Sequence, residues 1–165
     1  MTTIDELLKA AERHARATLI GGKAEMTPIT HLVRREGQDV VIATPWRNAD
    51  EKELTRRVLA GLVKDDQVVR YMMLNEGWMR VAQPGEFTPE QWASIQSGDE
   101  LPRIDPICQH PKRIEIVVAI AIEKGGKTIR VWETKRDKQG NCVELAEIDT
   151  DADQWRGPTL DLLNA

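Results

Sequence analysis

The chain has 165 residues, the size of one ordinary domain, and its 41 % hydrophobic and 30 % charged residues suit a globular protein with its own core. Its 23 basic and 27 acidic residues give a net charge of −4, which argues against a dedicated nucleic-acid-binding protein. The sequence shows no secretory signal and no apolar run of membrane-spanning length, so we expect a cytoplasmic protein with no membrane partner.

The chain opens with a predicted helix. Thr3 and Glu6 have the spacing of a capping box, and an apolar stripe follows at intervals of three and four residues. Residues 26–35 and 39–44 are short and β-branched, and Gly37 lies in the turn between them. This pattern predicts a β-hairpin.

A second helix is predicted to begin after Asn48 and to run to Lys64. Asn48 is a good N-cap, and a lysine is favourable at the C-terminal end of a helix. The apolar stripe expected to pack on a sheet consists of Leu54, Val58 and Leu62, widened by Leu59 and Val63.

The middle of the chain combines a strand with a long excursion. Residues 68–74 are apolar on both faces, which predicts a central strand, and Gly77 predicts a bulge or bend in residues 75–79. Residues 82–111 are proline-rich and have little apolar periodicity, apart from one short helix that Thr88 can cap.

The last third is predicted to be a meander of strands at residues 113–123, 127–136 and 142–148, followed by a loose acidic tail at 149–165. Hairpin, single strand and meander together predict an α+β fold in one domain over residues 1–165. We expect a largely antiparallel sheet of about six strands with the helices packed mainly on one face.

Strong catalytic and phosphate-binding motifs are absent from the sequence. Cys108 and His110, with Cys142, offer a weak pattern for a metal site or for thiol catalysis. Without a second closely spaced ligand pair, ordinary residues near strand ends are the favoured interpretation, so we expect no catalytic residue, no bound metal and no cofactor.

A candidate binding pocket draws on two strands. If the strand at 68–79 neighbours the one that begins near residue 113 and runs antiparallel to it, the end of one lies beside the start of the other. The side chains that would gather there are Glu76, Trp78, His110, Arg113 and Glu115. A surface ion pair between Glu76 and Arg113, with Trp78 covering core at the rim, is the simpler alternative.

Two stretches, RYMMLNEGWM (70–79) and QHPKRIEIVVAIAIEKGGK (109–127), carry a resemblance. They resemble a family of small bacterial and phage-borne proteins of unassigned function, in which Glu-x-Trp-Met precedes a loop and His-Pro-x-Arg-x-Glu. The resemblance implies no activity, but it groups the five pocket residues and omits Cys108.

These observations favour a non-enzymatic binding or accessory protein, phage- or prophage-associated, that acts through a protein partner or by self-association. One alternative is a small hydrolase-like or metal-assisted enzyme that uses His110 and Glu76. Another is single-strand nucleic-acid binding across Arg130, Trp132 and Lys135, where an aromatic ring alternates with cations.

Overall fold

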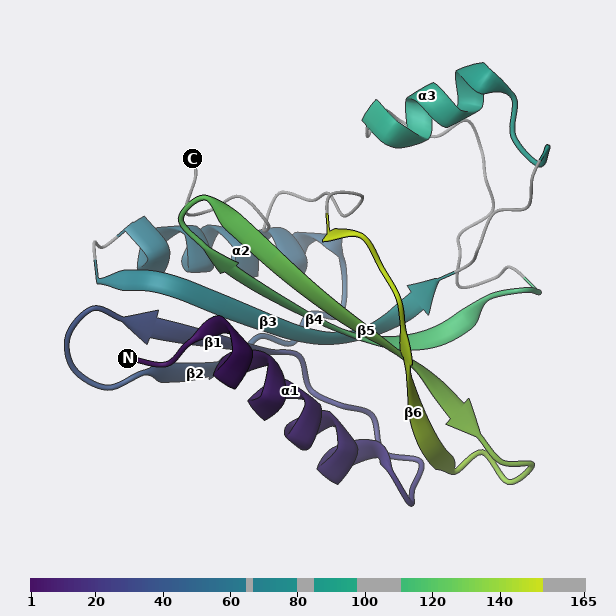
Figure 1. The fold of residues 1–165 in the computed structure, drawn as a ribbon, viewed down its shortest axis with the longest axis horizontal. Helices are drawn as coiled ribbons and strands as arrows, with labels where there is room; N and C mark the ends of the chain where they lie inside the picture. The colour runs from purple at the N-terminus through teal and green to yellow at the C-terminus, as the bar shows by residue number, and fades with distance from the viewer. Residues whose placement is uncertain (65–66, 80–84, 98–110, 153–165) are drawn as a thin grey trace.

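The computed structural model describes residues 1–64, 67–79, 85–97 and 111–152. Its centre is a six-stranded antiparallel sheet with the strand order β2-β1-β3-β4-β5-β6 (Figure 1). This confirms the α+β fold and the antiparallel sheet predicted from the sequence. In chain order the elements are α1 (Ile4–Leu19), β1 (Ile29–Arg34), β2 (Val40–Ala43), α2 (Ala49–Lys64), β3 (Val68–Met79), α3 (Pro89–Ser97), β4 (Ile114–Glu123), β5 (Gly126–Arg136) and β6 (Cys142–Ile148).

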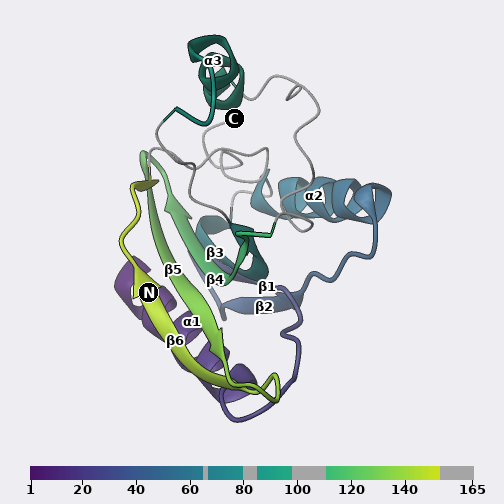
Figure 2. The ribbon, with the colours of Figure 1, turned by 90° about the vertical axis from the view of Figure 1, so that its right-hand side faces the viewer.

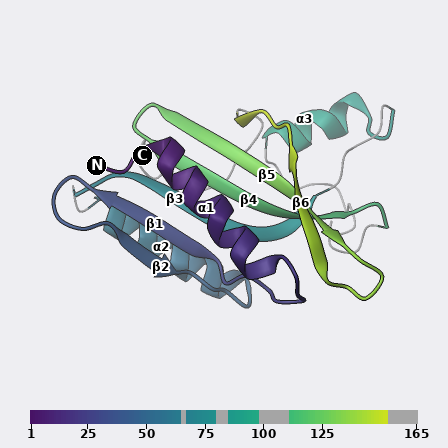
Figure 3. The same cartoon turned by 60° about the horizontal axis from the view of Figure 1, so that its bottom comes forward.

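Helix α1 begins at the predicted capping box. The Thr3 hydroxyl accepts a hydrogen bond from the Glu6 backbone N–H, and the Glu6 carboxylate accepts one from the Thr3 N–H in return. The helix lies across β3 and β4 (Figure 3), and its apolar face joins a hydrophobic cluster that includes Met72, Leu74 and the fully buried Trp132. The buried positions of α1 are Leu7, Leu8, Ala11, Ala15 and Leu19.

Helix α2 packs on the opposite face of the sheet, so the expectation that the helices share one face is wrong (Figure 2). Its cluster contains the alternate residues of β3, Tyr71 and Met73, and those of β4. The physical reason is that β3 and β4 are apolar on both faces, and each face must be covered to remove it from water.

The predicted contact face of α2 is correct only for its two widening residues. Leu54, Val58 and Leu62 are 63, 54 and 38 % exposed, whereas Leu59 and Val63 are buried against the sheet. Relative to the predicted face the helix is rotated about its axis, and Thr55 and Arg56 line a cavity beneath it together with Leu59. Three apolar side chains are therefore left on the outer side of α2.

Strand β3 continues through Gly77 without a bulge, contrary to the sequence-based prediction. Its pairing with β4 keeps one register from Arg70↔Glu123 to Met79↔Ile114. On its other side β3 pairs with β1 only as far as Ile29↔Leu74, and Pro28, which precedes Ile29, has no N–H to extend that ladder. Within the described residues, the last part of β3 has a neighbouring strand on the β4 side alone.

The other local predictions are confirmed where the structure describes them. Thr88 caps α3 through reciprocal hydrogen bonds with Gln91, at 2.8 and 3.2 Å, and the three-stranded meander is present. Most of the predicted tail at 149–165 lies outside the described residues, although Ala152 packs against the α2-side cluster. No described helix combines the length and the apolar character needed to cross a bilayer.

The rotation of α2 predicts unequal costs for two leucine substitutions in one helix. Leu59→Ala should destabilise the protein by about 2–5 kcal/mol, because it leaves a cavity against the sheet. Leu54→Ala should change stability by no more than about 0.5 kcal/mol, because Leu54 is solvent-exposed. Urea unfolding measures both, and equal losses would contradict the observed rotation.

Candidate functional site

The register of β3 and β4 brings most of the predicted pocket residues together. Trp78 lies opposite Glu115 and Glu76 lies opposite Val117, so these side chains share the α1-side face of the sheet. The Arg113 guanidinium lies 4.8 Å from the centre of the Trp78 ring, a cation–π geometry. His110 lies outside the described residues.

A connecting segment crosses the strand ends on this face. After α1, the carbonyl of Gly22 accepts a hydrogen bond from the Cys142 N–H at the start of β6. The chain then runs from beside β6 to β1, which lies toward the opposite edge of the sheet (Figure 1). On the way, the Met26 N–H donates a hydrogen bond to the Glu76 carboxylate. That hydrogen bond fastens the crossing segment to the end of β3.

A cleft of about 320 Å³ lies between the crossing segment and the ends of β3 and β4. We call it the acidic tryptophan cleft, after the side chains of Glu25, Trp46, Glu76, Trp78 and Glu115 that line it. Sequence reasoning alone misses Glu25 and Trp46. Each comes from a connecting segment, and only tertiary packing decides where such a segment runs.

Glu115 is held by an ion pair inside this region. Arg136 donates from Nε to the Glu115 carboxylate at 2.7 Å, and its Nη2 donates to the second carboxylate oxygen. The paired side chains are 26 and 20 % exposed. A bidentate pair of this kind fixes the orientation of the carboxylate and balances its charge.

Glu76 has a different electrostatic environment. Burial raises the pKa of the Glu76 carboxyl above its usual value, and the charges of Glu115 and Glu25 raise it further. The hydrogen bond from the Met26 N–H and the charge of Arg136 act in the opposite direction. No ion pair among the described residues gives Glu76 or Glu25 a cation, so the negative charge of the cleft is only partly balanced.

A second cavity of about 240 Å³ lies beneath α2 and shares the walls Trp46 and Glu76 with the cleft. Lys52 reaches into it and lies 5.6 Å from the centre of the Trp46 ring. Two buried hydroxyls, those of Thr30 and Thr44, also line it and are 3.4 Å apart. This side of Trp46 therefore already faces a cation.

The cysteine hypotheses gain no support from the described residues. Cys108 lies outside them, and Cys142 is a buried free thiol whose pKa burial raises, the opposite of an activated nucleophile. The described ranges contain no group of three or more His, Cys, Asp or Glu side chains placed to hold a metal ion.

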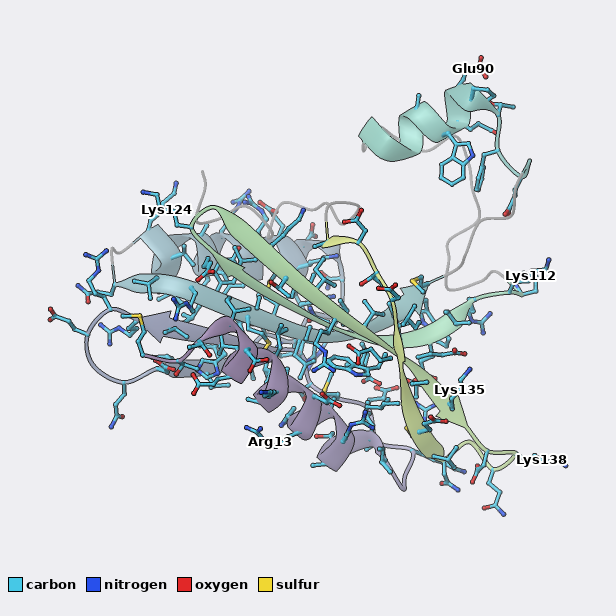
Figure 4. All side chains as sticks on the ribbon, in the orientation of Figure 1. Arg13, Glu90, Lys112, Lys124, Lys135 and Lys138 are labelled. Carbon is cyan, nitrogen blue, oxygen red and sulfur yellow. The ribbon has the colours of Figure 1, made fainter. Side chains whose placement is uncertain are left out.

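The proposed nucleic-acid face does not form. Trp132 is fully buried under α1, and Arg130 is bonded at 2.7 Å both to Glu12 and to Glu147. Lys135 pairs with Glu133 at 2.6 Å. The basic side chains around β5 are also dispersed, since Lys124 and Lys138 lie in the turns at its opposite ends (Figure 4). No ring is available there for a base to stack on.

Comparison of the chain with protein-family models, with curated proteins and with solved structures returned no match. The resemblance to small phage-borne proteins therefore stays a prediction from the sequence. The fold and the geometry of the cleft carry the functional argument.

Replacing Glu76 tests its electrostatic environment. Because the folded-state pKa is raised above the ordinary value of 4.5, the ionised carboxylate destabilises the fold, and this loss grows as the pH rises through the interval between the two values. Glu76→Gln should therefore raise Tm at pH 7. The gain should vanish near about pH 4, where the carboxyl is protonated in both states.

The glutamine oxygen can still accept from the Met26 N–H, so the variant isolates the charge. Glu144→Gln, at an exposed position of β6, is the matched control and should leave the pH profile of Tm unchanged. A fall in Tm at pH 7 for Glu76→Gln would show that the carboxylate stabilises the fold instead.

Proposed function

We propose that this is a non-enzymatic binding or accessory protein that contacts a partner protein at the acidic tryptophan cleft. The observation that carries the proposal is an open cleft at one end of the sheet, lined by two tryptophans that belong to neither hydrophobic cluster. Trp78 is 44 % exposed there. Exposed tryptophans are enriched at the centre of protein interfaces, and polar groups typically form the rim around them.

The chemistry of the cleft supports binding more than catalysis. Glu115 is neutralised by Arg136, and Glu76 accepts a backbone hydrogen bond that also positions the chain. Both carboxylates therefore have structural partners. A general base must be able to hydrogen-bond to the proton that it abstracts. The existing partners of Glu76 and Glu115 compete with that role.

A hydrolase-like enzyme using Glu76 and His110 is the second candidate function. One observation favours it, because the raised pKa of Glu76 is a property that acid–base catalysts share. A hydrolytic activity that disappears in both Glu76→Gln and His110→Ala would establish this alternative. The buried free thiol of Cys142 suits the reducing cytoplasm, which is the compartment we propose, with a phage or prophage association.

Photo-crosslinking from Lys112 tests the proposal. Lys112 is exposed next to Arg113, whose guanidinium lies on the Trp78 ring, so a photoreactive residue there samples the mouth of the cleft. In cells that make the protein, we expect one discrete adduct, identified by mass spectrometry. An adduct with twice the mass of the chain would identify self-association.

Two controls make the result specific. The same photoreactive residue at Lys124, at the far end of the β4–β5 hairpin (Figure 4), should give no such adduct. Trp78→Ala should remove the adduct from position 112, and an unchanged Tm would show that the fold is intact. Absence of an adduct at 112, or its persistence in Trp78→Ala, would contradict the proposal.

A further inference from the structure

The charges that line the acidic tryptophan cleft have one sign. Glu25, Glu76 and Glu115 contribute carboxylates, and no described lysine or arginine lines the cleft. Arg136 balances Glu115. The charges of Glu25 and Glu76 remain, and a ligand that places a cation between them would remove the unfavourable interaction.

The tryptophans supply the second half of the chemistry. Arg113 lies over the Trp78 ring and Lys52 lies over the Trp46 ring, at 4.8 and 5.6 Å from the ring centres. Neither cation lines the cleft, and Lys52 approaches Trp46 from the cavity beneath α2. Both rings therefore already lie against a cation of this chain while they also line the cleft. Indole rings attract cations through the negative potential of their faces.

We propose that the acidic tryptophan cleft binds the guanidinium group of an arginine side chain presented by the partner protein. This inference rests on the proposed function, and it names the chemical group by which the partner is recognised. A guanidinium is planar and can stack on indole rings while its N–H groups donate to carboxylates. A lysine ammonium provides a point charge and no plane to stack.

The size of the cleft agrees with a single side chain. At about 320 Å³ it lies at the lower end of the range for small-molecule sites, which extends to roughly 1,000 Å³. The cleft is also formed at the end of a rigid ladder, because Glu76, Trp78 and Glu115 all lie on paired strands. The carboxylates are thus held in place before an arginine arrives, which lowers the entropic cost of binding it.

Short peptides that differ in one side chain test the inference. The probes are blocked Gly-Gly-X-Gly-Gly peptides with arginine, citrulline or lysine at X. Citrulline keeps the shape of arginine and removes its charge. NMR of the indole N–H groups of Trp46 and Trp78 reports binding, with the fully buried Trp132 as the internal reference. We expect the arginine peptide to shift the signals of Trp46 and Trp78 and to bind about tenfold more tightly than the citrulline peptide.

The variants separate the cleft from general electrostatics. Glu76→Gln and Glu25→Gln should each weaken binding of the arginine peptide several-fold, whereas the exposed Glu144→Gln should leave it unchanged. Equal binding of the arginine and citrulline peptides, or equal weakening by Glu144→Gln, would overturn the inference. A lysine peptide that binds as tightly as the arginine peptide would overturn the choice of guanidinium.

Failure of this inference and failure of the proposed function give different results. If the Lys112 adduct forms and depends on Trp78 but the peptides show no arginine preference, the partner contact stands and the arginine assignment is wrong. If the arginine peptide binds but no Trp78-dependent adduct forms, the cleft recognises guanidinium groups and the protein-partner proposal is wrong.

Discussion

The pairing of β3 with β4 is the interaction on which the rest of the structure depends. The two strands keep one register over the ten residues from Arg70 to Met79, and both faces of this ladder are apolar for most of its length. Helix α1 covers one face and α2 covers the other. Both hydrophobic clusters contain residues of β3 and β4, so loss of this pairing would disrupt both of them. The same register continues to the strand ends, where the residues change from apolar to acidic and aromatic. Core and cleft are thus two parts of one ladder.

The crossing segment shows how the cleft is connected to the core. Met26 is buried in the α1-side cluster, and its backbone N–H bonds to Glu76 at the same time. The side chain therefore belongs to the core while the backbone closes one wall of the cleft. Burying a carboxylate costs free energy unless hydrogen bonds or cations compensate it, and here one backbone N–H compensates only in part. The raised pKa of Glu76 is the measurable sign of that incomplete compensation.

Local signals in the sequence predicted most of the elements, because caps, turns and alternating apolar residues act over a few residues. The Thr3–Glu6 capping box and the meander are examples, and the contact of Trp78 with the start of β4 followed from antiparallel pairing alone. The errors have a common cause. Leu54 and Leu59 of α2 lie on overlapping apolar stripes, and the choice between them depends on tertiary packing that no local pattern encodes. Glu25 and Trp46 reach the cleft from connecting segments, and Gly77 stays in register because β4 pairs with β3 on both sides of it.

The early end of β1 has a consequence for how this protein can change over evolutionary time. Because Pro28 follows the crossing segment and β1 pairs with β3 no further than Leu74, the sheet is narrower at the cleft than at its centre. Glu25, Trp46 and Trp78 line the cleft at this narrow part and lie outside both hydrophobic clusters. Substitutions there alter the chemistry of the cleft at little cost in folding free energy. Under the proposed function, selection at these positions would act through what the cleft binds, and the same scaffold could acquire a new partner without redesign of its core.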